Sequence, residues 1–160
     1  MLTHFRRPVC LSVMSADLAI CSNVETVGTL YQRDAQRFHL LLTEPKVCEP
    51  CTPVEHPGLP SADQLRLIWI EMSPLRVTMT MQGNGKLSYR HLWERNAYGL
   101  SRYWLQGDAV GQSHQLQLRN FTVGLHLDGN PLPTSLALEY ELWSAHSRLG
   151  RYTLQLDIQH

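Results

Sequence analysis

The sequence contains little lysine and has no net charge. Its 160 residues include 14 Lys and Arg against 14 Asp and Glu, and Lys46 and Lys86 are the only lysines. A neutral chain creates no long-range positive field, so we expect no general nucleic-acid binding. The chain also lacks an apolar run near the ~20 residues of a membrane-spanning helix, so we expect no transmembrane segment.

Cysteine is missing from the last two thirds of the chain, because all four cysteines lie at or before Cys51. Familiar catalytic patterns are missing as well: there is no H-E-x-x-H, no G-x-S-x-G and no Walker loop. His91 is interpreted as a packed residue rather than a base. We therefore favour a protein that is not an enzyme and has no cofactor. A catalytic pocket formed by residues far apart in the chain would leave no motif in the sequence.

Five prolines between residues 44 and 63 divide the chain into three regions. Each proline removes a backbone donor and fixes its own φ, so this stretch is predicted to be an extended linker or arm. Residues 1–43 form an N-terminal region, and residues 64–160 form the main body.

The main body shows the alternation of apolar and polar residues that is typical of β-strands. The strands expected from it cover Leu65–Glu71, Leu75–Gln82, Lys86–Trp93, Tyr98–Gln106, Leu116–Leu127, Leu136–Leu142 and Tyr152–Ile158. In the fifth of these the alternation changes parity, which predicts a bulge near Arg119 and Asn120. About seven short strands predict an antiparallel β-sandwich or barrel.

Alternation also suggests how one hairpin of this body pairs. A three-residue loop at Gly83–Gly85 keeps every pair on one face. The pairs it predicts are Met81 with Leu87, Met79 with Tyr89, Val77 with His91 and Leu75 with Trp93. Tyr89 and Trp93 then face the core.

The N-terminal region allows two interpretations of its secondary structure. Apolar or small residues recur there at steps of three and four: Val24, Val27, Tyr31, Ala35, Phe38 and Leu42. This spacing favours a helix over residues 23–43. The β-branched residues and Gly28 favour the alternative, a pair of strands that turns at Arg33 and Asp34.

The start of the chain also has two interpretations. Arg6 and Arg7 precede an apolar stretch, and Leu18–Cys21 resembles a bacterial lipoprotein cleavage box, which would imply export to the periplasm or cell envelope. Asp17 interrupts the apolar stretch, which favours an ordinary N-terminal strand. Envelope and cytoplasm therefore both remain open as locations.

A basic and aromatic segment, Lys86–Gln106, is the candidate binding region. It holds five of the chain's 13 aromatic residues together with several arginines. Aromatic platforms next to arginine can stack on sugar rings or anchor a protein partner. The candidate residues are Tyr98, Arg102, Trp104 and Arg90. The function we expect is a non-enzymatic binding or assembly module for a protein or glycan, in the cell envelope if the chain is exported and of undetermined oligomeric state.

A zinc site is the alternative that the cysteines suggest. Cys48, Cys51 and His56 have the spacing C-x2-C-x4-H, which resembles the first three ligands of a zinc knuckle. Ser61 stands where the fourth ligand would be, so a tetrahedral site needs a ligand such as Cys21 from the N-terminal region. The function would then be that of a zinc-stabilised intracellular adaptor.

Overall fold

The computed structural model describes residues 3–15, 17, 20–44, 66–83, 87–106 and 113–160, and these form ten antiparallel strands. Their bounds are β1 (Thr3–Ser15), β2 (Ile20–Gln32), β3 (Phe38–Glu44), β4 (Arg66–Met72), β5 (Arg76–Gln82), β6 (Leu87–Glu94), β7 (Tyr98–Gln106), β8 (Ser113–Asp128), β9 (Ser135–Ser144) and β10 (Ser147–Ile158). Within these residues no helix is long and apolar enough to cross a membrane.

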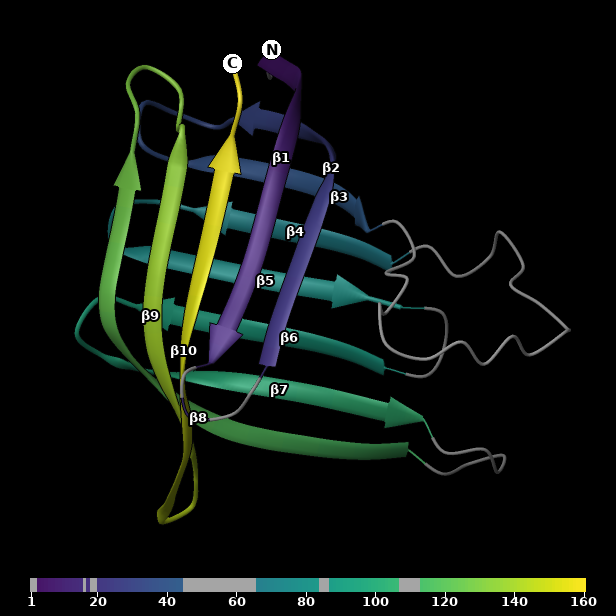
Figure 1. The fold of residues 1–160 in the computed structure, drawn as a ribbon, viewed down its shortest axis with the longest axis vertical. Coiled ribbons are helices and arrows are strands. Elements are labelled where there is room, and N and C mark those ends of the chain that lie inside the picture. The colour runs from purple at the N-terminus through teal and green to yellow at the C-terminus, as the bar shows by residue number, and fades with distance from the viewer. Residues whose placement is uncertain (1–2, 16, 18–19, 45–65, 84–86, 107–112) are drawn as a thin grey trace, which may run out of the picture.

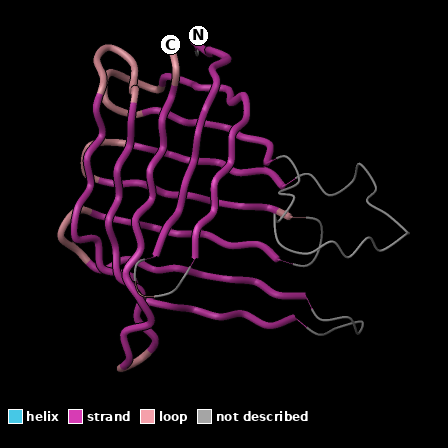
Figure 2. The backbone as a smooth tube through the Cα atoms, in the orientation of Figure 1, coloured by secondary structure: helices cyan, strands magenta, loops and turns pink. Residues whose placement is uncertain are grey.

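The ten strands form a closed barrel in which nearly every strand pairs with its neighbours in sequence. Closure comes from β1, which pairs with β2 on one side and with β10 on the other. Figure 1 shows β9, β10 and β1 crossing β3 to β7 at a steep angle, and Figure 2 shows how little of the described chain lies outside strands. β8 joins the two layers, because its first half pairs with β7 and its second half with β9.

Alternate side chains of each strand fill the barrel. Leu30, Leu40, Leu42, Trp93 and Leu156 are among those with no exposed surface. Burying large apolar side chains in this way is the main favourable term in folding. Because successive side chains point to opposite faces, the residues between these core positions lie on the outside of the barrel.

The structure confirms an antiparallel β fold and extends it. The main body contributes seven strands, β4 to β10, as expected. Residues 3–44 add three more strands to the same barrel, so the protein is a closed ten-stranded barrel rather than a sandwich.

The helix expected over residues 23–43 is wrong, and the alternative hairpin is present. β2 and β3 pair from Gly28 with Leu42 to Gln32 with Phe38, around a turn at 33–37. Gly28 marks a close approach of the two strands, since a Cβ there would come within 2.5 Å of the Leu42 Cδ2 atom. The helical spacing was a coincidence, because Val24, Phe38 and Leu42 are buried in the core, whereas Val27 is exposed and Ala35 lies in the turn.

The signal-like start of the chain is a strand of this barrel. β1 places Val9 and Leu11 in the core. Residues 18 and 19 of the cleavage-box resemblance lie outside the described residues, and so does the proline-rich stretch from residue 45 onwards.

The β5–β6 hairpin keeps the expected faces but not the expected register. Met81 pairs with Tyr89, Met79 with His91 and Val77 with Trp93, two residues away from the prediction. Leu75 lies outside the strand and is exposed. A slip of two residues leaves every side chain on the same face, so alternation cannot detect it.

The change of parity in β8 is produced by a bulge, as expected, although it lies further along the strand. The register shifts between Thr122 and Gly124 rather than at Arg119 and Asn120. Asn120 and Thr122 are both fully buried, so the inward parity continues past the predicted position.

Substitution of Gly99 should test how closely β6, β7 and β8 approach one another. A Cβ at Gly99 would overlap the Leu92 carbonyl oxygen, which accepts a hydrogen bond from Asn120 Nδ2 at 3.0 Å. Gly99→Ala should therefore lower the free energy of unfolding by about 2–4 kcal/mol in urea titrations. Gly124→Ala, where the nearest atom is 3.9 Å away, should change it by less than about 1 kcal/mol.

Candidate functional site

Three of the four predicted binding residues lie together on the outer face of β6 and β7. Strand pairing sets Arg90 directly opposite Arg102 and Ser88 directly opposite Trp104. Both arginines are exposed, and Trp104 is 39% exposed. We call Arg90, Arg102 and Trp104 the arginine–tryptophan patch.

The two arginines of the patch face each other without a neutralising partner. Neither guanidinium group forms an ion pair or a hydrogen bond with another residue that the structure describes. Like charges directly opposite on a sheet repel, which destabilises the pairing. The strand register therefore holds two positive charges opposite each other, and a bound anion would reduce their repulsion.

A groove adjoins the patch on the outer face of β3 to β6. Its volume is about 440 Å³, within the usual size range of small-molecule sites. The residues that line it are Arg33, Arg37, Phe38, His39, Glu71, Met72, Ser73, Arg76, Thr78 and Arg90. Arg90 thus belongs to both the groove and the patch.

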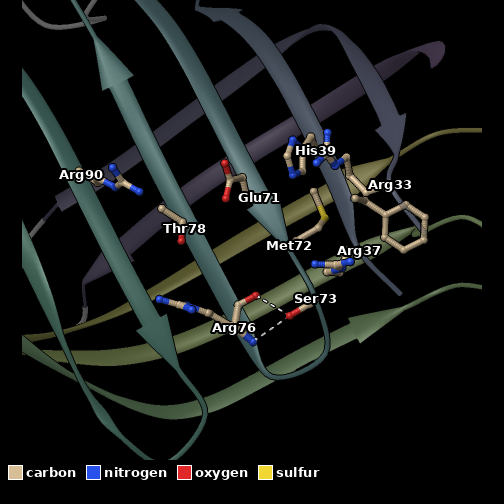
Figure 3. A pocket seen from close by; sticks show the side chains of 10 residues that line it. Arg33, Arg37, His39, Glu71, Met72, Ser73, Arg76, Thr78 and Arg90 are labelled. Carbon is tan, nitrogen blue, oxygen red and sulfur yellow. Dashed lines mark hydrogen bonds between the residues drawn. The ribbon is translucent and has the colours of Figure 1, made fainter. Parts of the chain in front are cut away.

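Neighbouring strands and turns bring the groove residues together. Arg33 and Arg37 belong to the β2–β3 turn, and Ser73 to the β4–β5 turn at the same end of the barrel. Register then aligns His39 with Glu71 and Glu71 with Thr78. Figure 3 shows Glu71 and Thr78 between the arginines of β5 and β6 and those of the turn.

The arginines of the groove differ in their partners. Arg37 forms an ion pair with Asp34, and Arg76 lies 3.5 Å from the Glu94 carboxylate. Arg33 and Arg90 have no such partner among the described residues. Exposed ion pairs contribute little energy, so Arg37 and Arg76 can exchange their partners for a ligand at small cost.

Burial is the main influence on the pKa of His39, which lies in the groove. Burial lowers the pKa of His39, and the charges of Arg33 and Arg37 lower this pKa further, while Glu71 opposes the change. The imidazole is therefore neutral near pH 7 and can both donate and accept a hydrogen bond.

A second tryptophan extends the patch along the sheet. Trp69 on β4 is 38% exposed and contacts His39 edge to face, with ring centroids 5.6 Å apart. It pairs with Thr80, which in turn pairs with Arg90. Trp69 was not among the predicted residues, because only the pairing of β4 with β5 and of β5 with β6 brings it into one row with Arg90.

Tyr98, the fourth predicted binding residue, does not join the patch. It lies at the opposite end of β7 from Trp104 and is exposed. Its ring contacts Phe121 at a centroid distance of 4.9 Å and lies beneath the Arg119 guanidinium group at 5.4 Å.

The zinc prediction falls mostly outside the described part of the chain. Cys48, Cys51 and His56 belong to the stretch 45–65, whereas Cys21 is exposed on β2, opposite Met14 of β1. In the ranges that the structure describes, no three His, Cys, Asp or Glu residues lie close enough together to hold a metal ion.

A buried polar cluster inside the barrel contains the histidine that was expected to be packed, and burial confirms that prediction. His91 Nδ1 lies 2.7 Å from Ser101 Oγ, which also accepts a hydrogen bond from Asn120 Nδ2 at 2.9 Å. The His91 ring stacks on Trp93 with centroids 4.9 Å apart and planes 5° apart.

The serine–histidine contact of this cluster resembles that of a hydrolase, but its setting is structural. Ser101 has no exposed surface, so a substrate cannot reach its hydroxyl group. Burial lowers the pKa of His91 to about 4, far below the range in which a general base works best. The cluster therefore pairs His91 and Ser101 inside the core, while Asn120 Oδ1 and the nearby Trp93 Nε1 have no hydrogen-bond partner among the described residues.

Comparison with known proteins identifies a shared fold. The YwiB protein from Bacillus subtilis is similar in structure. Its crystal structure matches with a TM-score of 0.60 and 12% sequence identity, over 99% of this chain and 94% of that one. Ail, the attachment invasion locus protein of Yersinia pestis, gives a TM-score of 0.22 at 11% identity, over 98% of this chain and 96% of that one, which is too low to support an argument. No known protein family and no curated protein matches the sequence.

Reversing one charge of the patch should stabilise the protein. Arg102→Glu turns the repulsive pair with Arg90 into an attractive one, so the free energy of unfolding should rise by about 0.5–1 kcal/mol. Arg102→Gln, which only removes the repulsion, should give a smaller rise. Urea titration at low salt measures both, and a loss of stability in Arg102→Glu would contradict the unpaired state of these arginines.

Burial of His91 should make stability depend on pH. The unfolded chain binds a proton at His91 near pH 6.5, whereas the folded protein does so only near pH 4. Between these values the unfolded state holds more protons, so stability falls as the pH decreases, by about 3 kcal/mol in total. His91→Gln should lose this part of the pH profile, and parallel profiles for the two proteins would contradict the prediction.

Proposed function

We propose that this protein is a non-enzymatic binding module that captures a glycan or protein partner on the outer face of β3 to β8. The observation that carries the proposal is the arginine–tryptophan patch, in which Arg90 and Arg102 lie side by side without partners and Trp104 lies next to them. Arginine and tryptophan are the residue types that most often dominate binding energy.

The shape of the barrel supports a partner that lies across the strands. Each described strand has two hydrogen-bonded neighbours, which leaves little sheet edge to accept a peptide as an added strand. At the residues of the patch, β6 and β7 are paired on both sides. Side chains on the outer face are therefore the groups that a partner meets at the patch. Trp69, Thr80, Arg90 and Arg102 lie in one row across four strands, which spans about 14 Å at the usual strand spacing.

The chemistry of this face favours a glycan over a protein. Around the arginines, Leu92 and Leu100 are apolar, but most of the outward side chains of β5, β6 and β8 are neutral and polar: Thr80, Gln82, Ser88, Gln115 and Gln117. Sugar hydroxyl groups can pair with all of them. Buried under a protein partner, each would need its own precisely placed hydrogen-bond partner to avoid a desolvation cost.

The core cluster supports a binding role in place of a catalytic one. Among the described residues, the only close contact between a histidine and a serine is that of His91 with Ser101, both of which are buried. The groove, by contrast, is open to solvent and lined by arginines.

Removal of the patch should abolish binding without unfolding the protein. Arrays of oligosaccharides and of peptides would be probed with the wild-type protein and with the double variant Arg102→Ala, Trp104→Ala. Affinity for the captured partner should fall by about 30-fold or more. The free energy of unfolding should change by less than about 1 kcal/mol, because both side chains are largely outside the core.

A control variant on the far side of the barrel separates the patch from general effects. Arg6→Ala removes an exposed arginine from the outer face of β1 and should leave binding unchanged. Undiminished binding by the double variant would overturn the proposal, and collapse of its fold would show that these side chains belong to the core.

A further inference from the structure

The groove combines arginines on two sides with a carboxylate between them. Arg33 and Arg37 approach from the β2–β3 turn, while Arg76 and Arg90 approach from β5 and β6 (Figure 3). Arginine presents a planar set of donors that matches the oxygen atoms of carboxylate and phosphate groups. The rim therefore suits an anionic group.

Glu71 restricts which anions fit. It lies between the arginines, next to Thr78 and His39 in the register of β4. A ligand made only of anionic groups would be repelled by its carboxylate, whereas a hydroxyl group would donate a hydrogen bond to it. The groove therefore suits a ligand that carries both an anionic group and hydroxyl groups.

We propose that the groove binds a sugar that carries a carboxylate or phosphate group, as one unit of an acidic glycan. The arginines hold the anionic group, and Glu71, Thr78 and the neutral His39 pair with the ring hydroxyls. This inference rests on the proposed function, because Arg90 links the groove to the arginine–tryptophan patch.

The patch explains why a chain fits better than a single sugar. Arg90 lies in the groove and its strand partner Arg102 lies beyond it, so a second acidic unit can lie between the two guanidinium groups. Trp104, diagonal to Arg90, offers a partly exposed ring for the next sugar. Binding of an anion there also removes the repulsion between the two arginines.

The first experiment compares an acidic oligosaccharide with its uncharged counterpart. Calorimetry would measure binding of an oligogalacturonate and of the same oligomer after methyl esterification, which keeps the ring hydroxyls. The acidic form should bind at least about tenfold more tightly. Arg33→Gln, outside the patch, should weaken its binding about tenfold, and Arg6→Gln on β1 should have no effect.

Glu71→Gln distinguishes a sugar from a simple anion. The substitution removes the negative charge but keeps the size of the side chain. Binding of the oligogalacturonate should weaken about tenfold, because a hydroxyl loses a charged acceptor. Binding of inorganic phosphate should instead become tighter, because a repulsive charge is gone. If both ligands respond in the same direction, the role of Glu71 is refuted.

His39 supplies an independent readout of where the ligand lies. Its ring faces Glu71 and Trp69 on β4, Tyr31 on β2, and Arg33 and Arg37 in the turn. An anion in the groove should raise the pKa of His39, and binding should tighten correspondingly as the pH falls from 7.5 to 5.5. Proton NMR would follow the imidazole signal, which is assigned by its loss in His39→Gln.

The remaining outcomes separate this inference from the proposed function. Equal affinity for oligogalacturonate and free galacturonate would support the acidic sugar as ligand but overturn its place in a chain, because the source would then be a free small molecule. Tighter binding of polyglutamate would indicate an acidic protein, and phosphate binding alone would indicate an adventitious ion only; either result overturns the inference. Capture of a neutral glycan through Arg102 and Trp104 would overturn it while leaving the proposed function intact.

Discussion

Closure of the barrel is the constraint on which the rest of the structure depends. β1 pairs with β2 and with β10, and this double pairing turns ten strands into a ring. Once the ring is closed, pairing with two neighbours fixes which residues of a strand point into the core and which lie outside. The register that sets Arg90 opposite Arg102 is held in place by the burial of the adjacent residues His91 and Ser101.

Alternation in the sequence was enough to predict the strands of the main body, but not their register or the strands before them. Alternation of apolar and polar residues shows which face of a strand a side chain lies on, but not which residue it pairs with. Met81 lies on the same face whether it pairs with Leu87, as predicted, or with Tyr89, as observed. In the N-terminal region, Val24 and Phe38 fitted a helical spacing equally well. The pairing of Gly28 with Leu42 decides between the two patterns, and spacing along the sequence does not reveal a pairing between residues this far apart.

In the candidate site too, residues close together in the sequence were predicted, and residues brought together by strand pairing were missed. Arg90, Arg102 and Trp104 were predicted because they lie close together in the sequence. Tyr98 belonged to the same cluster, yet six residues of extended strand separate it from Trp104 by about 20 Å. His39 and Glu71 had no local signal, since they acquire their neighbours through the pairing of β3, β4 and β5.

The first and last strands lie side by side in this ring. The backbone of Gln159 donates to the carbonyl of Pro8, and β1 runs against β10. A ring of paired strands has no intrinsic first member, so a linker could join β10 to β1 while the chain is opened at a turn such as residues 95–97. Such a circular permutant would keep every strand pair while changing the order in which strands leave the ribosome. The surface that carries the arginines is thus a property of the ring and not of the order in which it is synthesised.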